Sequence, residues 1–221
     1  MRRGLFLTFE GTEGSGKSTQ ISILSKRLHD AGYNVLTLRE PGGTPIGEEI
    51  RHTLKHSKNN DAMTPEAELL LMNASRAQLV REVIRPALEA GRIVLSDRFY
   101  DSTTAYQGYG RELDPVLVKA IIDVAVGDTR PDLTFLLLVS PETSRERLLA
   151  RQRTMPFVRD RFEEADRNFF DRVAKGYTEI ASKEPGRVRI INATDGVEAV
   201  STRIWNTLQP VLARKDNPSI C

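Results

Sequence analysis

The sequence predicts an α/β protein with the architecture of a doubly wound sandwich, in which a parallel β-sheet lies between two layers of helices. Short apolar runs alternate along the chain with longer amphipathic stretches. Runs such as LFLTF, IVLSD and LTFLLLV are almost entirely apolar, as strands covered on both faces must be. Because helices cover both faces of such a sheet, we expect its strands to be parallel.

Each predicted strand is a short apolar run bounded by polar or glycine-containing segments. The first run follows two arginines, in a pattern that superficially resembles a signal peptide. It is short and meets Glu10, so we interpret it as a strand. In chain order, the predicted strands are Leu5–Glu10, Asn34–Arg39, Arg92–Asp97, Leu133–Val139 and Arg187–Asn192.

Six amphipathic segments between or after these runs are predicted to be helices. Thr64, Pro65 and Glu66 indicate a helix start, with an N-cap, a proline in the first turn and an acidic neighbour. Gly91 stands where a C-cap glycine belongs, and Pro86 is expected to kink the last turn before it. The predicted helices are Lys17–Ala31, Thr64–Ala90, Asp114–Val126, Pro141–Gln152, Glu163–Ser182 and Gly196–Ala213.

Length and composition favour one domain with a small partner. A chain of 221 residues can bury a good core. We place a single domain at 1–214 and expect 215–221 to be a disordered tail, because the end of the chain has little to bury. The 32 basic and 30 acidic residues nearly cancel, which gives no general argument for binding nucleic acid or membranes.

Cysteine content and hydropathy exclude two further classes of protein. The single cysteine, Cys221, cannot form a disulfide framework or a thiol cluster for zinc, and it fits a reducing, cytoplasmic setting. Apolar runs all fall short of the roughly 18 residues that a membrane span needs. We therefore expect a protein without a membrane segment.

A glycine-rich stretch, FEGTEGSGKST, joins the first strand to the first helix. Gly11, Gly16, Lys17 and Ser18 satisfy the pattern G-x-x-x-x-G-K-[ST]. Glycines let successive N–H groups point at phosphate oxygens, while Lys17 reaches the β- and γ-phosphates and Ser18 is placed to ligate Mg²⁺. The alternative is a glycine-rich turn that only packs the helix tightly. The strand before the motif and the helix after it favour a phosphate cradle.

Arginine is concentrated in one region. Of the 32 basic residues 24 are arginine, and eight of these lie between Arg145 and Arg172. A guanidinium binds phosphate oxygens bidentately and cannot lose its proton, so a mobile arginine segment could close over a transferring phosphoryl group. We predict such a lid at about 150–162, with Arg151, Arg153, Arg159 and Arg161. Solvated helix faces with ion pairs are the alternative, favoured for Arg167 and Arg172 and open for Arg145 and Arg147.

Charged side chains also end two strands, at the edge where α/β sheets bind ligands. Arg39 ends the second strand, and Asp97 with Arg98 ends the third. Asp97 can order a magnesium-bound water, and Arg98 can reach between donor and acceptor phosphates. A helix cap or a structural ion pair is the alternative for each, but a neighbouring phosphate cradle favours the functional interpretation.

Together these stretches resemble one family. FEGTEGSGKST, REPGGT, the SR-AQ of Ser75 to Gln78, DRFYDSTTAYQG and DRFEEADRNFFDRVAKGY are similar in order and spacing to bacterial thymidylate kinases, which are P-loop nucleoside monophosphate kinases. The resemblance runs from about Leu5 to about Ala193. It implies transfer of the γ-phosphoryl group of ATP to dTMP with Mg²⁺, a five-stranded parallel sheet and a homodimer.

The resemblance also implies roles for single residues at the phosphates. Lys17 and Arg98 hold the donor and acceptor phosphates, with Arg39 and Arg51 assisting Arg98. Ser18 and Asp97 serve the metal. Arg151 and Arg159 are the catalytic arginines of the lid. The ATP-binding segment comprises Gly11, Thr12, Glu13, Gly14, Ser15, Gly16, Lys17, Ser18 and Thr19.

The remaining implied contacts surround the nucleoside. Arg76 hydrogen-bonds the thymine edge, with Thr103 and Gln107 as further polar contacts. Tyr106 lies against the sugar, where its bulk disfavours a ribose 2′-hydroxyl, and Glu13 faces the deoxyribose and the metal. The helix after the lid brings Tyr177 towards the site.

Met72 departs from the family pattern, which places a base-stacking phenylalanine four residues before the thymine-binding arginine. A thioether can still pack on a ring face, but a methionine on a helix is also ordinary core filler. Fewer residues therefore support the prediction that the base is thymine than support the predicted class of reaction.

Two other functions stay open at this point. Another nucleoside or nucleotide kinase would use the same loop, Asp-Arg pair and lid, and it differs only in its base pocket. A GTP-dependent switch protein would need an Asn-Lys-x-Asp guanine-binding motif, and the sequence does not contain one. Such a switch would also have no use for an arginine-rich lid.

Overall fold

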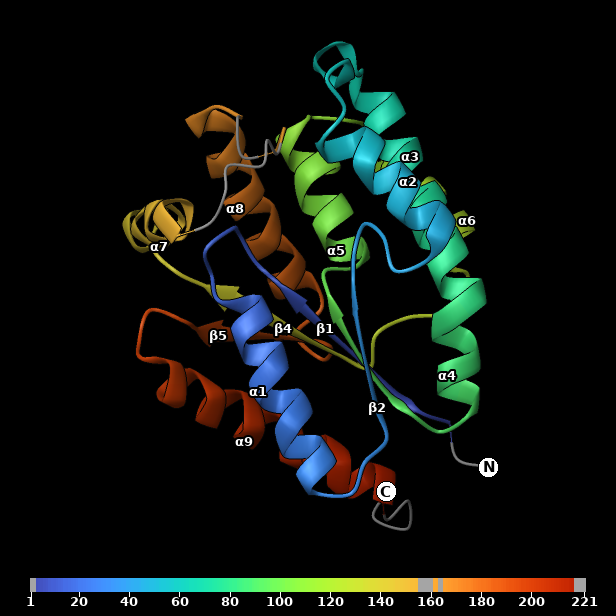
Figure 1. Ribbon diagram of the computed structural model, residues 1–221, viewed down its shortest axis with the longest axis vertical. Coiled ribbons are helices and arrows are strands. Elements are labelled where there is room, and N and C mark those ends of the chain that lie inside the picture. Colours follow the sequence, from blue (N-terminus) through green and yellow to red (C-terminus); the bar gives the residue numbers. More distant parts are fainter. Residues whose placement is uncertain (1–2, 155–160, 163–164, 217–221) are drawn as a thin grey trace.

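The computed structural model describes residues 3–154, 161–162 and 165–216, with the backbone alone for Pro141, 151–154 and Asp216. Within this part of the chain lies a parallel five-stranded sheet in the order β2-β3-β1-β4-β5 (Figure 1). All five predicted strands are confirmed, with boundaries that shift by at most one residue. The strands are β1 (Leu5–Glu10), β2 (Val35–Arg39), β3 (Ile93–Asp97), β4 (Leu133–Leu138) and β5 (Val188–Asn192).

Helices cover both faces of the sheet, so the predicted α/β sandwich is confirmed (Figure 1). Three short segments are not α-helical: a 3₁₀ turn η1 (Asn60–Ala62) and two π-helical segments, η2 (Val80–Ile84) and η3 (Thr104–Gly110). The α-helices of the described residues are α1 (Lys17–Asp30), α2 (Pro45–Lys55), α3 (Pro65–Leu79), α4 (Arg85–Glu89), α5 (Tyr100–Thr103), α6 (Pro115–Val126), α7 (Pro141–Thr154), α8 (Arg167–Lys183) and α9 (Val197–Asp216).

The alternation of side chains along β1 explains the two layers. Leu5, Leu7 and Phe9 point to the face that α1 and α9 cover. Phe6 points to the opposite face and packs with residues of α3, α4 and α6. On that same side, α8 packs against η3 and contributes Tyr177 to the core.

The segment predicted as one helix over 64–90 is helical throughout but irregular. The π-helical turn η2 separates α3 from α4 and lies directly before Pro86. Proline has no N–H to donate, so it removes one helical hydrogen bond from this turn. Two other helical segments, α2 and the run from Tyr100 to Gly110, were not predicted.

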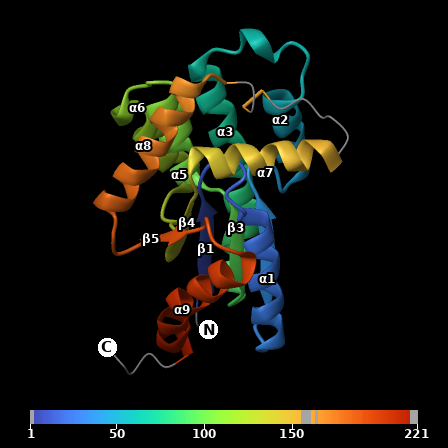
Figure 2. The same cartoon turned by 90° about the vertical axis from the view of Figure 1, so that its left-hand side faces the viewer.

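The C-terminal elements agree with the prediction to within a few residues. α7 crosses the edge of the sheet near the start of α1, as Figure 2 shows. α9 continues to Asp216, and the rest of the expected tail, 217–221, lies outside the described residues. Within the described ranges, no helix combines the length and the apolar character needed to cross a membrane.

Candidate functional site

The loop from Gly11 to Gly16 joins β1 to α1 and needs glycine at two positions for steric reasons. Gly11 has φ +134°, and a Cβ there would lie 2.4 Å from the carbonyl oxygen of Leu137. Gly14 has φ +72°, and its Cβ would lie 2.7 Å from the carbonyl oxygen of Ser144 on α7. Both positions combine a left-handed backbone with a close main-chain neighbour, so a side chain fits at neither.

Lys17 begins α1 and turns back over this loop. Its Nζ donates to the carbonyl oxygens of Gly11 at 3.1 Å and Thr12 at 3.0 Å. Burial and the nearby Arg98 guanidinium together lower the pKa of Lys17 to about 8, against the opposing effect of Glu13. The ammonium group is thus held beside the loop and is easier to deprotonate than usual.

Ser18 and Asp97 meet across the end of the sheet. The Ser18 hydroxyl donates to Asp97 Oδ2 at 3.2 Å, and both side chains are partly exposed. A hydroxyl and a carboxylate are hard oxygen ligands, which fit a Mg²⁺ ion that keeps most of its waters. Among the described residues, no cluster of three His, Cys, Asp or Glu side chains offers an all-protein metal site.

Arg98 follows β3 and lies at the centre of a polar network. Its backbone has φ +71°, a left-handed conformation that is uncommon outside glycine. The guanidinium donates to Glu13 at 2.7 Å, Ser102 at 2.9 Å, Tyr177 at 3.1 Å and Tyr106 at 3.3 Å. Although burial acts in the opposite direction, Arg98 holds the pKa of Glu13 well below its usual range. Arg98 therefore joins the glycine-rich loop to the helices beyond β3.

Glu10, the last residue of β1, supports Arg98 from behind. Its buried carboxylate accepts hydrogen bonds from the Phe99 N–H at 2.7 Å, the Ser102 hydroxyl at 2.6 Å and the Tyr177 hydroxyl at 3.1 Å. Burial, aided by repulsion from a neighbouring aspartate, raises the pKa of Glu10 to about 7. Since both hydroxyls donate to Glu10, their lone pairs are available to Arg98.

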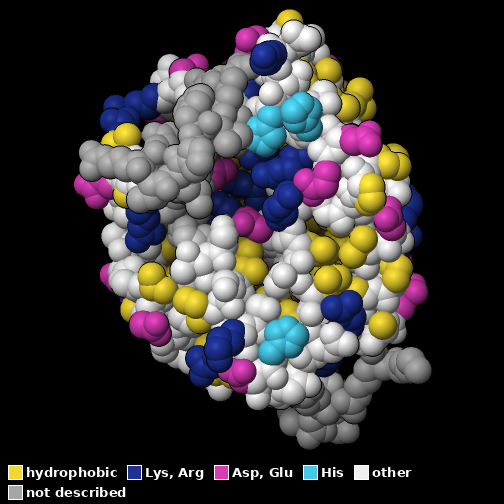
Figure 3. Space-filling view, in the orientation of Figure 1, with side chains coloured by type: hydrophobic (Ala, Val, Ile, Leu, Met, Phe, Trp, Pro, Cys, Tyr) yellow, Lys and Arg dark blue, Asp and Glu magenta, His cyan; other side chains and the backbone are white. Residues whose placement is uncertain are grey.

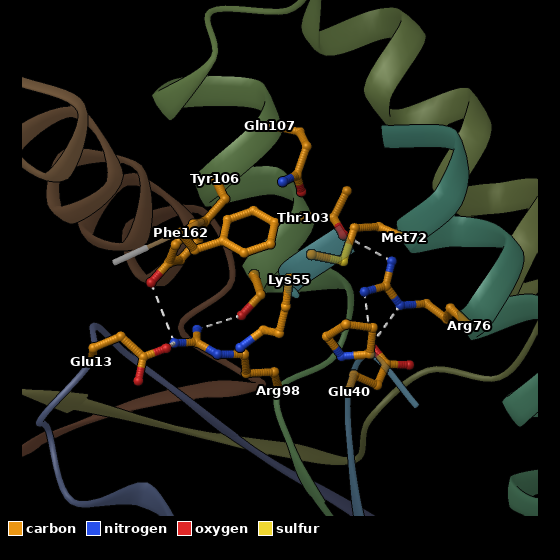
Figure 4. A pocket seen from close by; sticks show the side chains of 12 residues that line it. Glu13, Glu40, Lys55, Met72, Arg76, Arg98, Thr103, Tyr106, Gln107 and Phe162 are labelled. Carbon is orange, nitrogen blue, oxygen red and sulfur yellow. Dashed lines mark hydrogen bonds and ion pairs between the residues drawn. The ribbon is translucent and has the colours of Figure 1, made fainter. Parts of the chain in front are cut away.

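Arg98 also borders a cavity, shown in Figure 4, that lies at the carboxyl end of the sheet beneath α2 and α3. On the surface, Lys and Arg side chains gather around a hollow near the centre of the same face (Figure 3). Seven of the nine predicted substrate-binding residues line the cavity. The lining residues are Glu13, Glu40, Pro41, Lys55, Met72, Arg76, Arg98, Ser102, Thr103, Tyr106, Gln107 and Phe162.

Arg76 forms one wall and is almost fully buried, with 2% exposure. Nε and Nη2 contact Glu40 Oε2 at 2.9 and 2.7 Å. Nη1 donates to Asn73 and to Thr103, each at 2.9 Å, and Nη2 donates to the Phe99 carbonyl at 3.2 Å. Every guanidinium nitrogen has a protein partner, so a contact with a base would share or replace one of these bonds.

Gln107 closes the opposite end of the cavity and is oriented by a buried carboxylate. Its Nε2 donates to Glu68 Oε1 at 2.7 Å. Glu68 has no exposed surface and also forms ion pairs with Arg111 and Arg161. Two arginines balance the one buried charge, and the amide of Gln107 is fixed in place beside the cavity.

The same chain matches proteins of known activity. The sequence model of the thymidylate kinase family matches residues 9–204. This chain belongs to the thymidylate kinase family. It is 46% identical over 209 residues to thymidylate kinase of Chlorobium luteolum, covering 92% of this chain and 96% of that one. It is 48% identical over 198 residues to thymidylate kinase of Nitratidesulfovibrio vulgaris strain DP4, covering 89% and 88%.

Structural similarity agrees with the sequence comparison. A crystal structure of thymidylate kinase from Ehrlichia chaffeensis matches with a TM-score of 0.74 and 33% identity, covering 94% of this chain and 99% of that one. Thymidylate kinases transfer the γ-phosphoryl group of ATP to dTMP and release dTDP and ADP. The chain is an ATP-dependent nucleoside monophosphate kinase, as the motifs and the resemblance predicted.

Two of the residues predicted for the thymidylate kinase acceptor site lie outside the cavity wall. Arg39 is half exposed, forms an ion pair with Glu48 at 2.9 Å, and lines a neighbouring groove together with Ser18 and Asp97. Arg51 donates to the carbonyl oxygen of Pro41 at 2.8 Å. Both side chains contact Pro41, in the segment after β2 that lines the cavity, and neither faces into the cavity.

The predicted lid is described only in part. Arg159 lies outside the described residues, and for Arg151 and Arg153 the structure describes the backbone in α7 alone. Arg147, for which a solvated helix face was an alternative, instead donates to the carbonyl oxygens of Gly14 at 3.3 Å and Ala193 at 3.0 Å. α7 is thus bonded to the glycine-rich loop.

Sequence reasoning missed five residues of the cavity wall and Glu10 behind it. Glu40, Pro41 and Ser102 belong to stretches that resemble the family, so REPGGT and DRFYDS held a usable signal. Lys55 belongs to no motif. It reaches the cavity because α2 ends there, and α2 was not predicted. Phe162 was predicted only as the last residue of the lid and as part of a stretch that resembles the family, and chain position alone does not show that it faces the cavity.

Proposed function

We propose that this chain phosphorylates dTMP in the cavity beside Arg98, with ATP bound at the glycine-rich loop. The observation that supports this most is the position of Arg98. Its guanidinium contacts Glu13 of the loop and Tyr106 of the cavity wall. A cation at that junction is within reach of both the donor and the acceptor phosphate.

On the donor side, the loop from Gly11 to Thr19 binds the phosphates of ATP through its N–H groups and the start of α1. Lys17 exchanges its bonds with the Gly11 and Thr12 carbonyl oxygens for bonds with the β- and γ-phosphates. The ammonium group is already held at the loop, so little reorganisation is needed. Positioned positive charge is the main contribution of protein groups to phosphoryl transfer.

Ser18 and Asp97 would hold Mg²⁺, Ser18 as a direct ligand and Asp97 through a bound water. Their hydrogen bond of 3.2 Å places the two oxygen atoms on the same side of the loop. When bound, the ion neutralises charge on the β- and γ-phosphates. Loss of either side chain is expected to raise the Mg²⁺ concentration that gives the half-maximal rate.

On the acceptor side, the phosphate of dTMP binds Arg98, with Arg39 and Arg51 close to its entrance. Glu13 faces the 3′-hydroxyl region of the sugar, and Tyr106 packs where a ribose 2′-hydroxyl would stand. The phosphate dianion of dTMP is itself the nucleophile, so the attack on the γ-phosphorus needs no protein base. Arg98 holds the attacking oxygen and balances its charge.

The base extends towards the far end of the cavity, where Gln107, Thr103 and Met72 lie (Figure 4). Gln107 supplies an amide already oriented by Glu68. Arg76 reaches the thymine edge by sharing its bond with Thr103. Met72 packs on the face of the ring.

The lid and the assembly complete the proposal. Arg151 and Arg159 stabilise the transferring phosphoryl group from a lid at about 150–162 in a single domain, 1–214. A homodimer is supported by exposed apolar side chains on α3 and α6, two helices that pack together; these are Leu70, Val116, Leu117 and Val124. Analytical ultracentrifugation tests the dimer, and a single-chain mass at micromolar concentration contradicts it.

The near balance of charge supports a protein that binds no nucleic acid and no membrane, and the single cysteine supports a cytoplasmic setting.

The function itself is tested by measuring ADP release with ATP and Mg²⁺ for each of five acceptors: dTMP, UMP, GMP, AMP and thymidine. We expect dTMP to give the highest kcat/KM. Equal or better turnover of another monophosphate would remove the thymidylate assignment and leave a nucleotide kinase of different specificity.

A further inference from the structure

Phe162, the last residue of the segment 150–162, lines the acceptor cavity. The residue is 6% exposed and lines the cavity together with Met72. Figure 4 shows its ring in the space between Tyr106 and Lys55, on the side of the cavity away from Arg76. The ring meets Tyr106 edge to face, with centroids 6.4 Å apart. The Phe162 ring is therefore part of the cavity wall.

The neighbouring residue anchors this ring at two points. The backbone N–H of Arg161 donates to the carbonyl oxygen of Lys55, at the end of α2, at 3.3 Å. The Arg161 guanidinium forms an ion pair with Glu68 on α3, and its centre lies 5.3 Å from the Phe162 ring. Because Glu68 is completely buried, this ion pair is shielded from solvent and holds the segment against α3.

A base that enters the cavity is expected to contact the Phe162 ring. It is narrow, with a volume of about 40 Å³, so a ring that enters it contacts the side chains that line it. The other ring on the wall, Tyr106, has its hydroxyl bonded to Arg98 and packs edge to face with Phe162. Met72 offers only a flexible thioether. A ring that enters beside Met72 must either displace Phe162 or pack on it.

We propose that Phe162 packs on the face of the acceptor's pyrimidine ring and is a specificity-determining residue of this chain, with Glu68 and Arg161 as its positioning residues. The base is held between Phe162 and Met72. Two apolar walls close together favour one planar ring of limited width, so a purine fits less well. The chain at Arg161 and Phe162 then contributes directly to acceptor binding. This inference rests on the proposed function.

The test compares Phe162→Leu with the wild-type chain for two ligands, dTMP and 2-deoxyribose 5-phosphate, which lacks the base. Loss of the ring is expected to weaken dTMP binding by calorimetry roughly three- to tenfold. The inhibition constant of 2-deoxyribose 5-phosphate should not change, because Arg98 and Glu13 remain. Phe162→Tyr keeps the ring and should bind dTMP within about twofold of wild type. If Phe162→Leu does not fold, Phe162→Met replaces it.

Phe170→Leu is the matched control, since Phe170 is a half-buried ring on α8 outside the cavity. It should leave both ligands unaffected. Unchanged or tighter dTMP binding in Phe162→Leu overturns the proposal, because the ring would then be neutral or an obstruction. Parallel weakening of both ligands also overturns it, since that indicates general damage to the cavity. A wild-type chain that prefers another monophosphate contradicts the proposed function instead.

Discussion

The two ends of the acceptor cavity are built in different ways. At the phosphate end, Glu10 ends β1, Arg98 directly follows β3, and Lys17 begins α1 after the glycine-rich loop; their bonds involve main-chain groups and ionised side chains. At the base end, Met72 and Gln107 project from helices whose positions depend on packing. The sheet edge thus presents charge, while packed helices shape the space beyond it.

This difference separates the chemistry from the choice of acceptor. Removing a group at the phosphate end should slow transfer to every acceptor, because the charge that stabilises the transition state is lost. Removing a group at the base end should change binding and selectivity and leave the rate at saturation nearly unchanged. Single substitutions at the two ends of the cavity test whether chemistry and acceptor choice are separate.

The largest effect is expected for Lys17→Ala. Loss of the ammonium group should lower kcat by on the order of a hundredfold or more with every acceptor, since positioned cations carry phosphoryl transfer. Steady-state kinetics at saturating ATP, Mg²⁺ and dTMP measures it, with circular dichroism to check the fold. Near-wild-type turnover would show that the donor phosphates bind elsewhere.

A change of pH should affect ATP binding less than Lys17→Ala affects kcat. In the free chain burial lowers the pKa of Lys17 to about 8, so the side chain is mostly protonated at pH 7 and mostly neutral at pH 9. Only the protonated form attracts phosphates, so the apparent Kd for ATP should rise about tenfold between these pH values. Lys17→Arg stays charged over this range and should not show the rise. A flat wild-type profile would contradict the prediction.

Met72→Phe should give the smallest change. A flat ring in place of the thioether adds stacking of about 0.5 to 1.5 kcal/mol, of which the sulfur already supplies a part. We expect dTMP binding to tighten severalfold at most, ATP binding to stay the same, and the preference for pyrimidine over purine monophosphates to sharpen. Titration calorimetry measures all three. Unchanged dTMP affinity in a folded variant would make Met72 core filler.

The sequence predicted the phosphate end of the cavity better than the base end. The strands were predictable because apolar runs covered on both faces have an unambiguous pattern, and the loop from Gly11 to Ser18 because its steric demands fix its residue types. Arg98 was predictable because it ends a strand. Each of these features depends on local chain geometry.

The missed elements depend on tertiary contacts. The helical run from Tyr100 to Gly110 contains glycines that look like loop residues, but a Cβ at Gly110 would come within 2.6 Å of the Phe169 ring on α8. Close packing therefore explains glycine there. For α2, Thr44 accepts from the Gly47 N–H at 3.0 Å and Pro45 follows, so a helix-start signal was present and was overlooked.

The division between chemistry and acceptor choice is tested most directly by Arg98→Ala and Gln107→Ala measured side by side. Both residues line one cavity, and kcat and KM for dTMP are determined at saturating ATP and Mg²⁺. We predict that Arg98→Ala lowers kcat by on the order of a hundredfold, whereas Gln107→Ala raises KM by roughly tenfold or less with kcat nearly unchanged. A large loss of kcat in Gln107→Ala, or a normal kcat in Arg98→Ala, would contradict this account.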